Sequence, residues 1–293
     1  MANLKEVRNR IASVKSTQQI TKAMKMVSAA KLRKATDRII QMRPYADKLS
    51  GILKNLLASA EDISLDFATE REAKNVLIIL ITSDRGLCGG FNSNLVKTAI
   101  RTIKENYSDQ AAKGNVSVLT VGKKGLDHFK RTQHNINSDY VELFGKLNFE
   151  DAAEAANHVM EGYSAGTYDR VELIYSRFKN AGTQIFQVDQ YLPVDLTPAN
   201  EASSPTNLDM IYEPSQQRIV EELVPLILRT QFFKALLESN ASEHGARMTA
   251  MDKASENANE MLKELKLSYN RARQAAITTE LIEIVSGANA LKG

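Results

Sequence analysis

The sequence predicts an α/β protein in which long N- and C-terminal helices form an antiparallel coiled coil beside a central α/β domain. Three observations support this prediction. Apolar side chains recur at alternating spacings of three and four residues near both ends of the chain, which is typical of coiled-coil helices. The middle of the chain alternates short apolar runs with amphipathic stretches. The 293 residues include only 6 prolines and 14 glycines, so little interrupts long helices.

Residues 1–60 are predicted to form the first coiled-coil helix. Its seam, the stripe of positions that would face a partner helix, starts at Leu4 and is sustained for about eight heptads. Pro44 lies inside the pattern and is expected to kink the helix or to leave a carbonyl unpaired. Over residues 18–28 the seam turns polar, so we expect loose packing there. The apolar side chains at this level move to Ile20, Met24 and Val27.

Residues 210–287 are predicted to form the second coiled-coil helix. Ser215 is a suitable N-cap, because its side-chain oxygen can accept a hydrogen bond from a free backbone N–H of the first turn. Pro225 is expected to cause a local irregularity. The helix is expected to stop at Ser286, before Gly287.

A central Rossmann-like α/β domain is predicted over residues 70–200. Strands alternating with helices indicate a layered structure with a largely parallel sheet. The predicted strands are 75–82, 116–122, 140–144, 170–178 and 183–192. The predicted helices are 95–103, 124–131 and 150–163. Residues 197–209 are polar and marked by proline, and are interpreted as the link to the second long helix.

The order of these parts makes the C-terminal helix longer than its partner. The central domain joins the end of the first helix to the start of the second, so the two helices must run antiparallel. If Leu56 faces Ile219, the numbers of facing residues add up to about 275, and Leu4 meets roughly Arg271. The residues from Ala272 onward then have no partner in this chain. Apolar side chains surround most of this segment, so we expect another chain to bury it.

Positive charge is concentrated in the N-terminal helix. The chain has a net charge of +3 and a pI of about 8.8. Residues 1–60 alone contain 13 lysines and arginines against 3 acidic residues. Such an arm suits a polyanion or an acidic protein surface, and it also fits a solvated helix face.

No group of residues in the sequence forms a recognisable active site. The loop at residues 83–90 follows a strand and precedes a helix, where phosphates are often bound, but it lacks the P-loop and the GxGxxG spacing. Cys88 is the only cysteine, which excludes disulfides, and no histidine is close to it in sequence. The four histidines are scattered, so we predict no metal site, no cofactor and no catalysis. No apolar run is long enough to span a membrane.

Three long segments resemble the gamma subunit of F-type ATP synthases. They are VRNRIASVKSTQQITKAMKMVSAAKLRKA at residues 7–35, TSDRGLCGGFNSN at 82–94 and ITTELIEIVSGANAL at 277–291. Residues 210–214 and 241–258 are also similar, so the resemblance covers nearly the whole chain. Gly245 departs from it, because the family pattern leads us to expect alanine there. Plastid members of the family resemble one another in an insertion that carries a cysteine pair. This chain lacks that pair, because Cys88 is its only cysteine, which favours a bacterial origin.

The resemblance implies a rotor shaft at the cytoplasmic face of the bacterial membrane, peripheral and not inserted. Members of the family place their coiled coil inside a hexamer of three alpha and three beta subunits, and contact the epsilon subunit and the c-subunit ring below. Their asymmetric shaft drives the catalytic beta sites through different conformations. The resemblance places the rotor–stator contacts at Met24, Lys25, Arg247, Arg273, Gln274 and Thr278. It places Glu213 toward the c-ring and epsilon.

Two alternatives belong to other functional classes. A basic coiled coil could bind nucleic acid, although residues 1–43 lack the aromatic side chains that stack on single-stranded bases. A nucleotide-binding α/β enzyme would require saturable ATP binding by the central domain. We predict neither activity.

Overall fold

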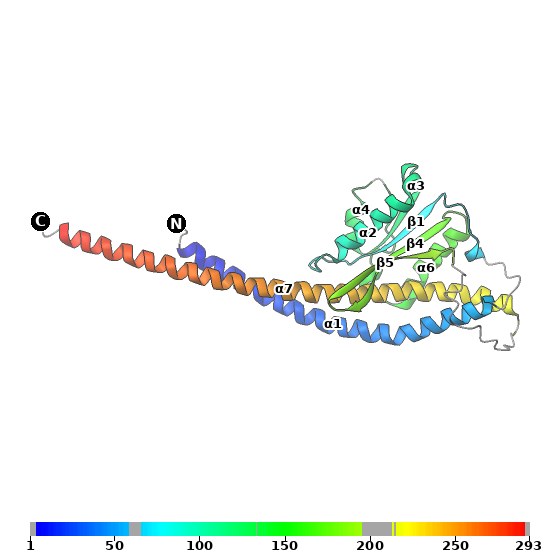
Figure 1. Cartoon of the computed structure of the whole chain (residues 1–293), viewed down its shortest axis with the longest axis horizontal. Coiled ribbons are helices and arrows are strands. Elements are labelled where there is room, and N and C mark those ends of the chain that lie inside the picture. Colours follow the sequence, from blue (N-terminus) through cyan, green and yellow to red (C-terminus); the bar gives the residue numbers. More distant parts are fainter. Residues whose placement is uncertain (1–3, 59–65, 133, 195–212, 214, 291–293) are drawn as a thin grey trace. The chain divides into compact units, whose positions relative to one another are not determined.

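The structure is a computed structural model that describes residues 4–58, 66–132, 134–194, 213 and 215–290 (Figure 1). It divides into two compact units. Unit 1 comprises Met1–Ser28 and Met248–Gly293, and unit 2 comprises Ala29–Arg247. The long helices α1 (Leu4–Ala58) and α7 (Gln216–Ala290) each contribute to both units.

Unit 2 contains a five-stranded sheet with the strand order β3-β2-β1-β4-β5. The strands are β1 (Val76–Ile81), β2 (Val116–Val121), β3 (Asn135–Asn137), β4 (Arg170–Asn180) and β5 (Thr183–Leu192). The first four strands are parallel, and β5 pairs antiparallel with β4 as a hairpin. Every residue of β1 is buried, as expected for a central parallel strand covered on both faces.

Helices cover both faces of this sheet. Ile78 and Leu80 of β1 point into a core with α2 (Phe91–Asn106) and α4 (Lys123–Phe129). Leu77 and Ile79 point the other way, into a core with α6 (Phe149–Ser164) and the first part of α7. Figure 1 shows the same arrangement, with α2 and α4 on one side of the strands and α6 and α7 on the other. The shorter helices are η1 (Asp66–Ala68), α3 (Ser108–Ala112) and α5 (Leu143–Lys146).

The predicted strand at 140–144 is wrong, and the strand at this edge of the sheet is β3 instead. Residues there form turns and the start of α5, with short-range bonds such as the Leu143 N–H to the Tyr140 carbonyl at 3.2 Å. Val141, Leu143 and Phe144 are buried through this turn, which explains why the segment is apolar without being extended. The real strand, β3, is only three residues long and contains two asparagines, so it carries no alternating apolar pattern.

The ends of α7 agree with the prediction at one terminus and differ at the other. The Arg218 N–H donates to the Ser215 side chain at 3.4 Å, so Ser215 caps the helix as predicted. The helix runs past Gly287 to Ala290, so the predicted stop at Ser286 is wrong. Neither Pro44 nor Pro225 ends the helix that contains it. The predicted link at 197–209 lies outside the described residues.

In unit 1, α1 and α7 pair along the predicted seam. Hydrogen bonds join Arg8 to Tyr269 at 3.1 Å and Thr21 to Ser255 at 2.7 Å. The numbers of these facing residues add up to 277 and 276, within two of the predicted register. The polar stretch is packed rather than loose, since Thr21 and Ser28 are buried. The apolar side chains beside it stay outside, and Ile20 and Val27 are each 57% exposed.

The same two helices pack within unit 2. Ala35 and Ile39 of α1 form a small core with Leu237 and Ala241 of α7. Arg43 also forms an ion pair with the buried Glu238, at 3.3 Å. The predicted seam therefore holds on this part of α1 as well.

Candidate functional site

The tip, meaning residues 272–290 of α7, is a helix with a large exposed apolar surface. In the observed register the first described residue of α1, Leu4, lies opposite about residue 273, so the tip extends beyond the described part of α1. Its large apolar side chains are between 48% and 67% exposed: Ile277, Leu281, Ile282, Ile284 and Val285. Exposed apolar patches of this kind usually mark an interaction surface.

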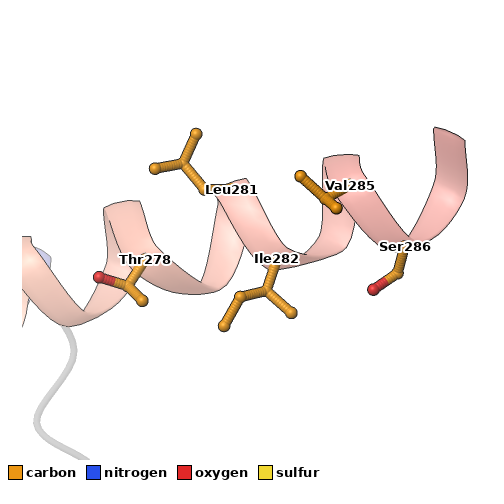
Figure 2. Close-up of a pocket in the computed structure, with 5 residues that line it drawn as sticks. All are labelled: Thr278, Leu281, Ile282, Val285 and Ser286. Carbon is orange, nitrogen blue, oxygen red and sulfur yellow. The ribbon is translucent and has the colours of Figure 1, made fainter. Parts of the chain in front are cut away.

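The apolar side chains of the tip are not confined to one stripe. Figure 2 shows Leu281, Ile282 and Val285, with Thr278 and Ser286, lining one face of the helix at spacings of three and four residues. Ile277 and Ile284 are also exposed but do not line this face, so they widen the apolar surface beyond it. The tip therefore offers a partner protein an apolar surface that is wider than a single stripe.

The predicted contacts Arg273, Gln274 and Thr278 lie together on the tip and are exposed. The Thr278 hydroxyl donates to the Gln274 carbonyl at 2.9 Å, which is an ordinary bond within a helix. The side chains of Arg273 and Gln274 are therefore available to a partner at the base of the apolar surface.

Met24 and Lys25 lie in unit 1 on the polar stretch of α1. Lys25 Nζ is 2.5 Å from an Asp252 carboxylate oxygen, so its charge has an internal partner. Both side chains remain more than 40% exposed, so this pair is accessible to an approaching protein. Met24 is half-buried.

Arg247 lies in unit 2 and is largely buried, which the sequence did not indicate. Its guanidinium pairs with Glu243 and donates to the backbone carbonyls of Arg85 and Gly86, at 3.3 and 3.1 Å. His244 Nδ1 lies 3.0 Å from the other side of the Glu243 carboxylate. The contacts of Arg247 therefore tie α7 to the loop that follows β1.

This cluster changes the acidity of its carboxylate. Burial alone would raise the pKa of Glu243, but the neighbouring His244 and Arg247 outweigh burial and hold that pKa below its usual value. Asp84, in the same loop region, behaves in the opposite way, because burial raises its pKa. The Lys123 backbone N–H donates to Asp84 at 3.2 Å and offsets part of that rise.

The loop after β1 is occupied by contacts within the chain. The Asn92 side chain accepts a hydrogen bond from the Ser83 N–H at 3.0 Å. Further along the loop, the Arg247 guanidinium donates to the carbonyls of Arg85 and Gly86. Positive φ angles at Leu87 and Gly89 make this a tight turn. Cys88 is buried, and burial raises the pKa of its thiol, which disfavours the reactive thiolate. These contacts agree with a structural loop rather than a phosphate cradle.

Other kinds of site are not found in the described part of the chain. Within those residues, no three histidine, cysteine, aspartate or glutamate side chains group as metal ligands would. None of the described helices has both the length and the apolar character that crossing a bilayer requires. Glu213, predicted to face the c-ring and epsilon, is exposed.

Comparison with known proteins identifies the family. A family model described as ATP synthase matches residues 3–291. The ATP synthase gamma chain of Cytophaga hutchinsonii is 57% identical and covers 99% of both chains. The gamma chain of Flavobacterium johnsoniae is 52% identical over the full length of both.

Solved structures show the same architecture. A central stalk and c-ring structure of the mitochondrial ATP synthase from Tetrahymena thermophila is 30% identical, with a TM-score of 0.58. It covers 80% of this chain and 99% of its own. A chain of the Euglena gracilis mitochondrial ATP synthase, at 23% identity, matches 98% of this chain with a TM-score of 0.70 and supports the fold.

The chain therefore belongs to the ATP synthase family. Within that family it is of the gamma type, and the central-stalk rotor function predicted from its sequence is confirmed. The predicted fold class is confirmed as well.

Proposed function

We propose that the chain is the non-catalytic, torque-transmitting subunit of a proton-translocating F-type ATP synthase, peripheral at the cytoplasmic face of a bacterial membrane. Its partners are an alpha–beta hexamer, in which one copy of the chain turns, together with the epsilon subunit and the ring of c subunits. Proton flow turns the ring and the shaft. The shaft then presents a different face to each beta subunit.

The observation that carries this proposal is the exposed apolar tip. Five large apolar side chains on residues 277–285 are about half or more exposed in the isolated chain. At about 25 cal/mol per Å² of apolar surface, covering them is worth several kcal/mol. A hexamer that encloses the tip would supply that cover.

The charged residues below the tip suit contacts that change during rotation. Lys25 is paired with Asp252 but stays partly exposed, so it can interact with acidic loops of a neighbouring subunit. Arg273, Gln274 and Thr278 are exposed beside the apolar surface. Contacts that differ among the three beta subunits would shift the closed–open equilibrium of each one differently, which is how binding energy at one site alters another.

Arg247 and Met24 are also proposed as stator contacts, with one qualification. Arg247 is engaged with Glu243 and two loop carbonyls in the isolated chain, so meeting a beta subunit would require it to exchange partners. The Glu213 region is proposed to face the c-ring and epsilon, since Glu213 is exposed next to the start of α7.

A non-catalytic role is supported by how the chain uses its reactive groups. Ser83 and Arg247 hold the loop after β1, and Cys88 is buried with a raised pKa. These groups serve packing, so ATP chemistry is assigned to the beta subunits.

Co-purification tests the proposal directly. Tagged chain expressed with alpha and beta subunits should bring down three of each for every copy of itself. The purified chain alone should show no ATP hydrolysis above the buffer rate. Enzyme-like hydrolysis by the isolated chain, or recovery without alpha and beta subunits, would overturn the proposal.

A further inference from the structure

Strand β4 extends well beyond its neighbour β1. The two strands pair from Val76 opposite Arg170 to Leu80 opposite Ile174, and β1 ends at Ile81. β4 continues to Asn180. In a strand, the N–H and C=O groups of alternate residues point to the same edge. The groups of Ser176 and Phe178 therefore point to the edge that β1 no longer covers.

Side chains of the two long helices take the place of the missing strand. The Ser176 N–H donates to the Ser239 hydroxyl at 3.0 Å, and the Ser242 hydroxyl donates to the Ser176 carbonyl at 3.2 Å. The Phe178 N–H donates to the Glu238 carboxylate at 3.2 Å. These bonds satisfy three of the four backbone groups on this edge, namely both groups of Ser176 and the Phe178 N–H. The fourth is the Phe178 carbonyl.

Arg43 of α1 binds that fourth group. Its guanidinium donates to the Phe178 carbonyl at 3.1 Å and to the Glu238 carboxylate at 3.3 Å. The arginine thereby neutralises the carboxylate that serves the Phe178 N–H. One strand edge, one residue of α1 and three residues of α7 form a single network.

Burial makes this network necessary. Ser176, Ser239 and Ser242 are fully buried, and Glu238 is 2% exposed. Water cannot replace a partner there, and an unpaired buried backbone group is costly. The serines and the glutamate of α7 therefore satisfy backbone groups of β4 that would otherwise be buried without a partner.

The hairpin turn beyond the network rests on the same face of α7. A Cβ atom at Gly245 would lie 3.1 Å from both the Cα and the carbonyl oxygen of Ala181, in the β4–β5 turn. Positions 238, 242 and 245 are spaced as one helix face. The absence of a side chain at Gly245 lets the turn approach the helix closely, which gives a physical reason for glycine where alanine was expected.

We propose that Glu238, Ser239, Ser242 and Gly245 of α7, with Arg43 of α1, form a joint that carries torque between the central sheet and the coiled coil. The hydrogen bonds and the close turn define the joint. Its torque-carrying role rests on the proposed rotor function. Directional bonds to the backbone groups of Ser176 and Phe178 add to the apolar packing and fix the register of the helix against the strand.

Hydrogen exchange on the isolated full-length chain tests the joint itself. The double variant Ser239→Ala/Ser242→Ala should make the Ser176 amide exchange about tenfold faster, because its buried acceptor is lost. The Ile174 amide, on the same edge but opposite β1, is the internal reference. The matched control Ser268→Ala changes an exposed serine of α7 and should leave both amides unchanged.

A second pair of variants separates hydrogen bonding from general destabilisation. Glu238→Gln keeps an acceptor oxygen for the Phe178 N–H, so protection of that amide should be largely retained. Glu238→Leu removes the acceptor and should raise the exchange of that amide about tenfold. Equal exchange in wild type, Glu238→Leu and the double serine variant would overturn the joint.

Rotational fluctuation in the assembled complex tests the torque-carrying role. A rod is attached to a cysteine introduced at Lys104, an exposed residue of α2, while the alpha–beta hexamer is immobilised. The native Cys88 is 2% exposed and is spared by the label. The double serine variant should increase the angular variance of the stalled rod about twofold, because a joint that opens more often is less stiff.

The outcomes distinguish the two proposals. A rod that never turns with ATP on the wild-type complex contradicts the rotor function. A rod that turns normally, with unchanged variance in the serine variant, contradicts the torque-carrying role even if exchange has increased. Proton pumping per ATP provides a further readout. Loss of the torque joint should lower the number of protons pumped per ATP, whereas a merely structural loss would lower pumping and hydrolysis in proportion.

Discussion

At the scale of single residues, several charged side chains of α7 within unit 2 form ion pairs inside the chain. Glu243 lies between His244 and Arg247 and is only 4% exposed. A buried carboxylate is tolerated because its partners compensate for the lost hydration. Removing any one of them leaves the others uncompensated, so this cluster should dominate the effect of pH on unit 2.

Glu243→Gln should destabilise the chain at neutral pH by about 3 kcal/mol, as expected when a buried pair is broken. The advantage of wild type should shrink in acid. Because the folded-state pKa of Glu243 is depressed, its contribution is fully present above its ordinary value of 4.5 and is lost as the pH falls through the folded pKa. Urea unfolding of both proteins between pH 7 and acid measures this, and a pH-independent difference would contradict it.

Lys25→Glu should lower the number of protons pumped per ATP in the assembled complex while leaving the fold intact. The variant replaces attraction to an acidic partner surface by repulsion. The internal pair with Asp252 is partly exposed, so its loss costs little stability.

Asp252→Asn is the matched control for Lys25. It removes the same internal pair but keeps the lysine charge, so pumping per ATP should stay at the wild-type level. If both variants reduce pumping equally, the internal pair is what matters, and Lys25 is not a stator contact.

The sequence predicted that some of the proposed contact residues are exposed, but not which charged side chains are bound within the chain. Arg273, Gln274 and Thr278 fall on an exposed segment that periodicity alone leaves unpartnered. Arg247 could not be placed in this way, because its partners are carbonyls of a loop more than 160 residues away in sequence. Backbone acceptors leave no pattern in a sequence, so neither this tie nor the serines at 239 and 242 could be foreseen.

At the scale of elements, the heptad pattern predicted the pairing of the long helices accurately. Facing residues add up to 276 or 277 in unit 1, against about 275 expected. The pattern did not show that the polar stretch packs tightly, because small hydroxyl side chains such as Thr21 and Ser255 can fill a seam by bonding to each other. Short elements were the weak point, since the three residues of β3 are too few to show a period.

Gly245→Val should destabilise unit 2 by about 2 kcal/mol, because the branched side chain would press on the backbone of the β4–β5 turn. The Phe178 amide should exchange faster in the same variant, as the turn is pushed from α7. Urea unfolding and exchange measure the two effects.

Gly287→Val is the control for position 245. It makes the same change on the same helix, where nothing lies within 4 Å of the added Cβ. It should be neutral or slightly stabilising, since glycine is the poorer helix former. Equal destabilisation by both variants would show that helix propensity, and not the contact with Ala181, sets the cost.

At the scale of the whole molecule, resemblance and physical reasoning lead to the same function by separate routes. The family match spans residues 3–291, so it predicts fold and function together. Periodicity predicts independently that the C-terminal helix outlasts its partner, and the structure shows the resulting exposed apolar segment. Neither route predicts how the sheet is fastened to the helices, because that depends on side-chain contacts across the fold.

Truncation of the C-terminus should separate the apolar tip from the residues beyond it. Removing residues 287–293 should leave assembly with alpha and beta subunits nearly unchanged, because within the described residues the large exposed apolar side chains of the tip precede Gly287. Removing everything after Ala272 deletes Ile277, Leu281 and Ile282 with their neighbours. That loss forfeits several kcal/mol of burial at about 25 cal/mol per Å², so assembly should be strongly impaired. Recovery of alpha and beta subunits with each tagged truncation measures the difference.

The isolated chain truncated after Ala272 should keep the helical circular dichroism of its remaining residues, since no other part of the described chain covers these side chains. Equal recovery from both truncations would mean that the hexamer grips the shaft elsewhere, and that burial of the tip does not hold the rotor in place.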